Sequence, residues 1–372
     1  MPLGPPSPQA QTTRPWLPEM HLNIWERESK RGAVTEAFLD VGLMLDIRDA
    51  TSSIELIFPW KIEVGEVEDL SGLVSRPEAI PAIFNESWAI TKVGSDAVVY
   101  DPIGIGTSFA IVPAAGLYKN SKHGQFDAIS IDIPALLGKA NTAARLVNSP
   151  IEKAYLRIRI HNIKRDFYCV GAGEHKDDWW MPSWQRTEDI DFRLNVRRGA
   201  PPGLEGTIGR FLEFSKVHLF LMRSRDKDIV FQDKLFKSSR SLEDENFWAE
   251  YSLRGPQAGL SENLERVKKS LGYQWKKAAE PDPVKEFGTL ARFKIVEFGI
   301  GKFLLVALLL GACGNVLWDG VKAGFSALMP EAVAEAKCVN LAAVAEITRQ
   351  ACVPGAKSEA GKDARSSAGS EK

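Results

Sequence analysis

The residues best suited to chemistry lie close together in the stretch 171–185, GAGEHKDDWWMPSWQ. Acidic and imidazole side chains stand there beside indole rings: Glu174, His175, Asp177, Asp178, Trp179, Trp180 and Trp184. Indole faces stack on rings, sugars or peptides, and carboxylates orient a bound group through hydrogen bonds. Because glycines flank the stretch, we expect a loop, and loops often carry binding residues. The sequence therefore predicts a site for an unidentified protein or small-molecule ligand.

Two other interpretations of this stretch stay open. The tryptophans can close the edge of a β structure while the acids face water, which is a structural role. A metal site would need further ligands, and neither His161 nor His218 stands at a spacing that identifies it as one. His21 and His123 show no ligand spacing either. All four are therefore interpreted as structural, and no metal is predicted.

Signatures of catalysis are missing from the sequence. It contains no GxSxG nucleophile elbow, HExxH zinc motif, paired CxxC, Walker A loop or EF-hand loop. We therefore predict no catalytic residue and no cofactor. An enzyme that uses the 171–185 loop near a membrane substrate is kept as an alternative to a binding or sensing protein.

Two cysteines near the carboxyl end, Cys338 and Cys352, have a chemistry that depends on their compartment. In an oxidising compartment they can close a short hairpin through a disulfide. They cannot do so along one straight helix, which would separate them by about 21 Å. Unpaired thiols on a helix are the alternative. Only 4 cysteines occur in the chain, which excludes a scaffold built on disulfides.

The segment 20–255 carries the 171–185 loop, and its apolar residues recur with a period of two. In AYLRIRIHN, aliphatic residues face one way and basic residues the other: Leu156, Ile158 and Ile160 against Arg157, Arg159 and His161. This alternation is typical of strands with one buried and one solvated face. We predict a mainly β fold, an antiparallel sandwich-like domain of one or two sheets or subdomains. A few helices are expected, at 134–148 and 243–253.

The segment 256–298 changes character and is expected to be a basic helical linker. Apolar residues stand in it at helical spacing, with lysines around them: Leu264, Val267, Leu271 and Trp275. Such a helix either lies on an anionic membrane surface or docks onto the β domain. Both possibilities stay open at this point.

The stretch 299–320 is strongly apolar, and residues 303–318 carry no charge. A helix of that uncharged length spans about 24 Å, somewhat less than a hydrocarbon core of about 30 Å. Trp318 suits an aromatic anchor at the membrane interface. We predict a single transmembrane helix over 299–320, and a buried helix of the globular part is the alternative.

Small residues on this helix predict contacts between copies of the chain. Ala307, Gly311 and Gly314 recur on nearly one face, and small residues at this spacing let helix backbones approach closely. Asn315 lies next to that face, where its amide can pair with the same residue of a second chain. We therefore expect a homo-oligomer. The alternative is a plain anchor whose Asn315 reaches lipid headgroups.

The two ends of the chain differ in composition from the rest. Residues 1–19 are rich in proline and lack the apolar core of a signal peptide, so a disordered leader is expected. A short helical tail is predicted over 321–353 and a disordered one over 354–372. Without a signal peptide, and with more basic residues before the span than after it, the amino-terminal domain is predicted to be cytosolic and the tail outside.

The composition is 44% hydrophobic and 26% charged, with a net charge of −1. No basic field favours nucleic acid, so this class of partner is excluded and membrane lipid is expected instead. The predicted function is a single-pass, membrane-anchored binding or sensing protein with a cytosolic β-rich domain. A membrane-associated enzyme and a membrane-perturbing effector controlled by that domain are the alternatives.

Overall fold

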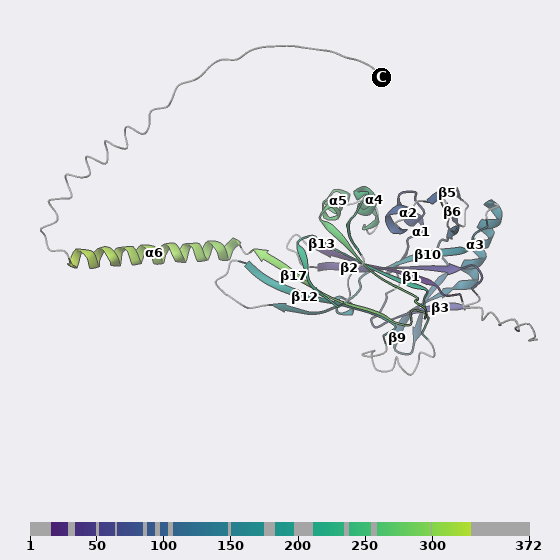
Figure 1. Ribbon diagram of the computed structural model, residues 1–372, viewed down its shortest axis with the longest axis horizontal. Helices are drawn as coiled ribbons and strands as arrows, with labels where there is room; N and C mark the ends of the chain where they lie inside the picture. The colour runs from purple at the N-terminus through teal and green to yellow at the C-terminus, as the bar shows by residue number, and fades with distance from the viewer. Residues whose placement is uncertain are drawn as a thin grey trace, which may run out of the picture. The chain divides into compact units, whose positions relative to one another are not determined.

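The computed structural model divides the chain into two compact units, Met1–Phe298 and Gly299–Lys372. The first unit consists mainly of strands with few helices, which confirms the predicted β-rich domain (Figure 1). The structure describes residues 16–28, 34–49, 52–63, 65–84, 88–93, 97–102, 107–147, 150–174, 183–196, 211–233, 238–253, 259–298 and 300–328.

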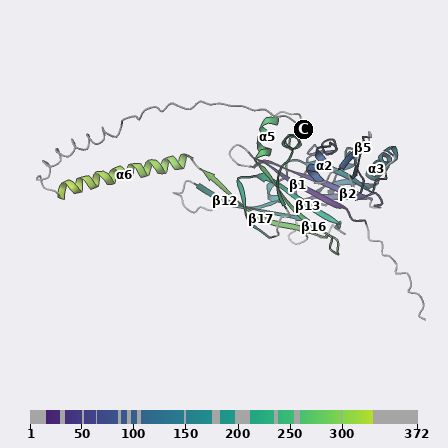
Figure 2. The ribbon, with the colours of Figure 1, turned by 45° about the horizontal axis from the view of Figure 1, so that its top comes forward.

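The largest sheet, here called sheet A, has ten strands among the described residues (Figures 1 and 2). In spatial order they are β15 (Ser238–Ser241), β16 (Ser270–Ala278), β13 (Lys216–Ser224), β1 (Glu19–Glu28), β2 (Val34–Asp46), β10 (Lys153–Ile160), β7 (Phe109–Ile111), β6 (Val98–Pro102) and β5 (Trp88–Val93). The short β4 (Val67–Asp69) also pairs with β10. The amino-terminal strand β1 therefore lies inside the sheet, between β13 and β2.

Two smaller sheets and several helices complete the described part of the fold. Sheet B contains β3 (Ser53–Phe58), β9 (Phe126–Asp132) and β8 (Tyr118–His123). Sheet C contains β11 (Cys169–Glu174), β12 (Ser183–Leu194), β17 (Phe287–Phe298) and β14 (Lys227–Gln232). The helices are α1 (Ser71–Val74), α2 (Ala79–Phe84), α3 (Ile133–Val147), α4 (Glu245–Tyr251), α5 (Leu260–Lys268), α6 (Ile300–Leu328) and the 3-10 turn η1 (Arg165–Phe167). The helices predicted at 134–148 and 243–253 are confirmed as α3 and α4.

A shared apolar core holds the three sheets together. Its buried residues come from all of them, as Ile158 of β10, Ile129 of β9 and Phe293 of β17 illustrate. The opposite face of sheet A is covered by α1, α2, α4 and α5 (Figure 1), where a second apolar cluster forms. Removing apolar surface from water stabilises such a structure by about 25 cal/mol per Å², so both faces of sheet A contribute.

The alternation predicted for β10 is confirmed, but its polar face is not solvated as the sequence suggested. Ile158 and Ile160 face the shared core, and Arg157 and Arg159 face the helices, yet both arginines are fully buried. The physical reason is that α4 brings Tyr251 onto this face. A period of two shows which residues share a face, but it does not show what covers that face.

The expectation of an antiparallel fold needs a correction, because two strand pairs of sheet A are parallel. β1 pairs with β13 in parallel, with Glu19 opposite Lys216 and His21 opposite His218. β10 pairs with β7 in the same sense. Periodicity predicts strands and faces but carries no information about strand neighbours, so these pairs could not be foreseen.

The expected helical linker over 256–298 is wrong beyond Lys268. Among the described residues of this range, only α5 is helical, and β16 and β17 follow as long strands of sheets A and C. The apolar residues that stand at helical spacing therefore belong to two different elements. Val267 lies on α5 and Trp275 lies on β16, and both are buried. The sequence of β17 does alternate as a strand does, but the prediction followed the abundance of lysine and overlooked this signal.

A set of buried charges connects sheet A to sheet C. Arg223 of β13 donates to Glu26 of β1 at 2.8 Å and also to Glu188 of β12. Lys227 of β14 lies 3.5 Å from Glu26 and 3.8 Å from Glu188. Arg165 of η1 approaches Glu188 at 2.5 Å from its more exposed position. The other four side chains are at most 2% exposed, so their charges are compensated by one another rather than by water.

The second unit contains α6, so the stretch predicted to span a membrane is helical. The residues predicted to mediate helix contacts, Ala307, Gly311, Gly314 and Asn315, are all exposed. Within the described residues, no helix combines the length and the apolar character needed to cross a bilayer. The transmembrane assignment of 299–320 stays a prediction from the sequence.

Several predictions fall on residues outside the described ranges. These include the leader up to residue 15, the tails from residue 329 onward, and both cysteines of the predicted disulfide, Cys338 and Cys352. The disulfide and the assignments of these segments therefore stay predictions.

Candidate functional site

A row of polar side chains follows the helix-covered face of sheet A. It comprises Glu19, His21, Asn23 and Arg27 on β1, Glu36 and Asp40 on β2, Arg157 and Arg159 on β10 with His161 directly after it, and His218 on β13. We call this set the polar face. Its members share a face because those on one strand are two or four residues apart, and the neighbouring strands pair in register. Polar groups at so many positions of one covered face make it the leading candidate for a functional site.

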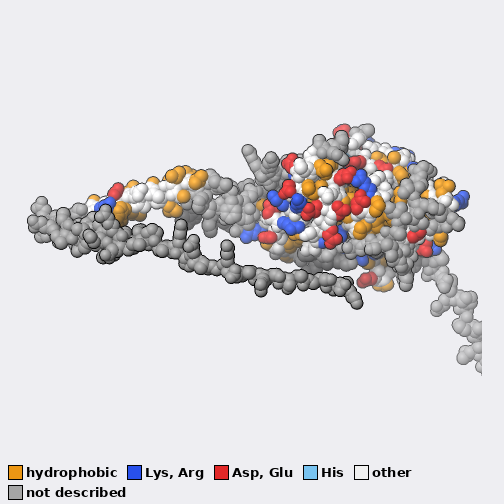
Figure 3. Space-filling model, turned by 90° about the horizontal axis from the view of Figure 1, so that it is seen from above, with side chains coloured by type: hydrophobic (Ala, Val, Ile, Leu, Met, Phe, Trp, Pro, Cys, Tyr) orange, Lys and Arg blue, Asp and Glu red, His pale blue; other side chains and the backbone are white. Residues whose placement is uncertain are grey.

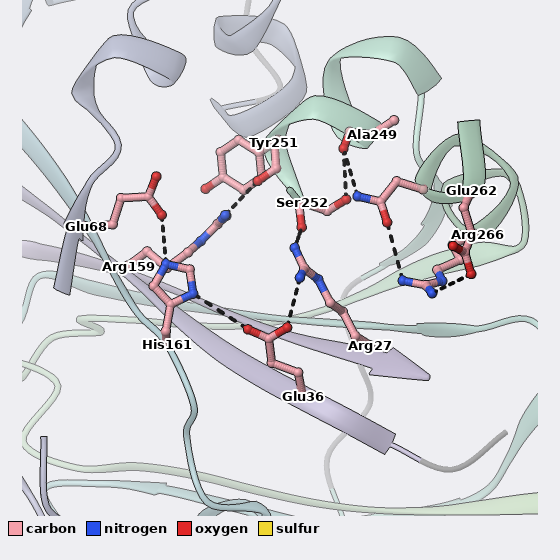
Figure 4. A network of polar contacts seen from close by, with 11 residues as sticks. Arg27, Glu36, Glu68, Arg159, His161, Ala249, Tyr251, Ser252, Glu262 and Arg266 are labelled. Carbon is pink, nitrogen blue, oxygen red and sulfur yellow. Dashed lines mark hydrogen bonds and ion pairs between the residues drawn. The ribbon is translucent and has the colours of Figure 1, made fainter. Parts of the chain in front are cut away.

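The centre of the polar face is an ion pair with no exposure to solvent. Arg159 Nε donates to Asp40 Oδ1 at 2.7 Å, and both side chains are 0% exposed. Arg159 also donates to the Tyr251 carbonyl oxygen at 2.7 Å (Figure 4). The Tyr251 hydroxyl in turn donates to Asp40 Oδ2 at 2.7 Å. These hydrogen bonds attach helix α4 to the sheet. Burial raises the pKa of the Tyr251 hydroxyl well above its usual value.

Arg157 places a second guanidinium beside the same carboxylate. Its Nη1 donates to the Tyr155 hydroxyl at 3.0 Å, and its Nη2 lies 3.7 Å from Asp40. Its Nε and Nη2 have no hydrogen-bond partner among the described residues. Gly42 makes room for this arrangement, because a Cβ there would lie 2.2 Å from the Tyr155 hydroxyl oxygen. The centre of the polar face therefore holds two arginines around one aspartate.

One end of the polar face continues toward solvent through partly exposed pairs. His161 Nε2 lies 2.8 Å from Glu68 and its Nδ1 lies 4.0 Å from Glu36 (Figure 4). Arg27 binds Glu36 at 2.8 Å and also donates to the Ser252 carbonyl oxygen after α4. The hydrogen bond with His161 lowers the pKa of Glu68, although burial raises it. These contacts attach the end of α4 to β1 and β2.

The other end of the polar face brings two imidazoles and a carboxylate together. Glu19, His21 and His218 each offer a ligand atom, and these atoms all lie within 4.8 Å of one another. Lys153 and Lys216 bind the two oxygens of Glu19 at 2.7 Å and 3.0 Å. Burial raises the pKa of Glu19, but the two ammonium groups outweigh it and hold the pKa at about 2. Among the described residues, only this cluster has the donor set and spacing for a metal ion.

A separate, open hollow of about 470 Å³ lies between sheet B and the segment after β3. Its lining carries charges of both signs: Lys61, Ile62, Glu63, Asn120, Ser121, Lys122, Asp127 and Ala128. Asp127 has a structural role, since its carboxylate accepts a hydrogen bond from the Ile62 amide at 2.9 Å. The hollow has no convergent set of polar groups comparable with that of the polar face.

The residues predicted as a binding site belong to another sheet. Glu174 ends β11 opposite Arg186, and Trp184 lies near the start of β12 opposite Glu297, both in sheet C. The remaining predicted residues lie outside the described ranges: His175, Asp177, Asp178, Trp179 and Trp180. Binding by the 171–185 loop therefore stays a prediction.

Sequence reasoning missed the polar face, although part of it left a signal. Asp40, Arg157 and Arg159 stand at single positions inside strongly aliphatic strands. A charge in such a place is expected to be paired, because an isolated buried charge is very unfavourable. The pairing of His21 with His218 left no signal, since it depends on a parallel register between distant segments.

Comparison with known proteins adds no identification, since no known protein family and no curated protein sequence matches the chain.

Proposed function

We propose that this protein is a membrane-associated binding protein in which α6 attaches the β-rich unit to a lipid bilayer. One observation carries the proposal, which is the exposed apolar surface of α6 (Figure 3). Its exposed residues are Leu304, Leu305, Leu308, Leu309, Leu310, Val316, Leu317, Trp318 and Val321. Each is between 52 and 72% exposed. Apolar side chains exposed on this scale mark a surface that contacts lipid or another protein.

The arrangement of α6 favours lipid as its main partner. Leu308, Leu309 and Leu310 follow one another along the helix, so they point in different directions around its axis. A helix that docks on one protein surface shows an apolar stripe and a polar face instead. Lys322 lies over the Trp318 ring at 5.5 Å, a basic and aromatic pair suited to the membrane interface. The predicted orientation, with the β-rich unit in the cytosol, is part of this proposal.

Binding is favoured over catalysis by the way the polar face uses its charges. Asp40, Arg157 and Arg159 are fully buried and contact one another or α4, so they are not placed to meet a substrate. They join helices to a sheet, which suits a rigid domain that presents a surface. Self-association through Ala307, Gly311 and Gly314 also belongs to the proposal, since these residues are exposed on α6.

Flotation with lipid vesicles tests the proposal. The full chain is mixed with vesicles of phosphatidylcholine and phosphatidylglycerol, and a Leu308→Lys, Leu317→Lys variant is compared with it. A leucine-to-lysine change in a membrane-embedded helix costs about 3 kcal/mol, so the double variant should lose nearly all flotation. Val230→Lys with Phe231→Lys is the matched control, because these residues are similarly exposed but lie on β14.

The wild-type chain and the β14 variant should float, and the α6 variant should stay at the bottom of the gradient. A wild-type chain that does not float, or an α6 variant that floats as well as the control, would overturn the proposal. Resistance of the floated chain to alkaline carbonate would then separate a crossing helix from one that lies at the surface.

A further inference from the structure

We infer that Glu19, His21 and His218 form a binding site for a first-row transition-metal dication of the Zn²⁺ type. The three side chains offer two imidazole nitrogens and one carboxylate oxygen within 4.8 Å of one another. This inference does not depend on the proposed membrane association, because the cluster lies within the first compact unit.

The parallel pairing of β1 and β13 positions the ligands. His21 is directly opposite His218, and both side chains lie on the helix-covered face of sheet A. Their ring centroids are 4.9 Å apart, with an angle of 70° between the ring planes. Glu19 precedes His21 by two residues on the same strand, so its carboxylate lies on the same face. Backbone pairing in a sheet fixes this geometry more firmly than a loop would.

His21 supplies the observation that points to a ligand. It is 8% exposed, and its Nε2 has no hydrogen-bond partner among the described residues. A buried ring nitrogen without a hydrogen-bond partner is energetically unfavourable. A metal ion at this position would give that nitrogen a partner. Neutral imidazole is the form that binds metal ions.

The donor set indicates the class of metal. Imidazole nitrogen together with carboxylate suits Zn²⁺ and neighbouring transition metals, whereas Mg²⁺ and Ca²⁺ prefer oxygen ligands alone. The side-chain amide of Gln274 lies 3.1 Å from His218 Nδ1. This contact with the Gln274 Nε2 group positions the His218 ring through one of its two nitrogens. Such a partner on the second nitrogen is the usual support of a metal-binding histidine.

Two lysines set the strength of the site. Lys153 and Lys216 bind the Glu19 oxygens at 2.7 Å and 3.0 Å, and their positive charges oppose a cation. They do not block Glu19, because each carboxylate oxygen can accept more than one contact. Removal of one ammonium should therefore increase metal affinity. This prediction distinguishes the site from loose binding by surface histidines.

Titration of the full chain, in detergent and without a histidine tag, tests the inference. Zn²⁺ binding is measured by calorimetry, and Co²⁺ serves as a probe whose absorption reports nitrogen coordination. We expect one metal per chain, with His218→Gln and Glu19→Gln each weakening the affinity by about 100-fold or more. Lys216→Met should strengthen it about tenfold. His123→Gln is the matched control and should change nothing, because His123 lies on β8 of sheet B beside Glu55.

Weaker binding in a variant can result from unfolding, but stronger binding cannot. The Lys216→Met variant therefore tests the inference even if the other variants do not fold. Absence of Zn²⁺ binding by the wild-type chain at 100-fold molar excess would overturn the inference. The same holds if His218→Gln binds as tightly as the wild type, if Lys216→Met gains nothing, or if Mg²⁺ binds as tightly as Zn²⁺.

Discussion

Replacing Glu188 with glutamine should strongly destabilise the first compact unit. Glu188 is 0% exposed and compensates the charges of Arg223, Lys227 and the more exposed Arg165. Glutamine keeps the shape but removes the charge, which leaves these cations with Glu26 as their main partner. Removing one member of a buried ion network typically costs about 3–5 kcal/mol.

The pKa of Glu188 reflects the same contacts and links this loss to pH. Burial raises that pKa, but Arg223, Arg165 and Lys227 outweigh it and lower the pKa from 4.5 to about 2. Such a shift corresponds to about 3 kcal/mol of stability at neutral pH. Because the folded-state pKa is the lower one, this stability is present above pH 4.5 and is lost as the pH falls toward 2. The difference between wild type and Glu188→Gln should thus be about 1 kcal/mol smaller at pH 4 than at pH 7.

Urea unfolding of the chain ending at Phe298, followed by tryptophan fluorescence at both pH values, measures the effect. Glu63→Gln is the matched control, since Glu63 is 62% exposed and pairs with the exposed Lys61. That change should cost about 0.5 kcal/mol or less. A cost of Glu188→Gln as small as that of the control, or one that is the same at pH 4 and pH 7, would refute the reasoning.

Three further predictions concern other parts of the fold. Gly42→Ala should destabilise the first unit by about 1–3 kcal/mol, because the new Cβ would clash with the Tyr155 hydroxyl. Tyr155→Phe in the same chain should restore part of this loss, and an unchanged urea midpoint for Gly42→Ala would contradict the packing. Asp244→Ala should cost about 1 kcal/mol by removing the cap of the Phe247 amide, whereas Asp244→Gly should cost less, since Asp244 has a left-handed φ of 52° that glycine adopts freely. In the chain ending at Phe298, Cys169 is the only cysteine, and burial raises the pKa of its thiol. Its alkylation should be at least about tenfold slower in the native protein than in urea, and equal rates would show that the thiol is accessible.

The sequence predicted the strands and the partition of their faces well, because a two-residue period is a local property. Ile158 and Arg157 were assigned to opposite faces of β10, and the structure agrees. What covered the arginine face was not predictable, since Tyr251 lies about 90 residues away and reaches it through the docking of α4. Burial by a distant element leaves no trace in the strand itself.

The candidate site was predicted less well than the fold for the same reason. His21 and His218 showed no ligand spacing, because their proximity is set by strand pairing and not by separation along the chain. The linker was misassigned because Leu264, Val267 and Leu271 fit a helical period, although α5 ends at Lys268 and Leu271 already lies on β16. Short apolar patterns of this kind match a helix and a strand about equally well, so only the pairing partner decides between them.

The position of β1 between β2 and β13 also governs when the chain can fold. Glu19 and Lys216, which face each other across this pair, are 197 residues apart in sequence. During synthesis β1 can pair with β2 early, but its other edge stays open until β13 has left the ribosome. Contacts of such long range slow folding, and an unpaired edge next to apolar strands invites association with other chains. The nascent chain therefore needs protection of this edge while the residues between β1 and β13 are being synthesised, which predicts a dependence on chaperones that act on ribosome-bound chains.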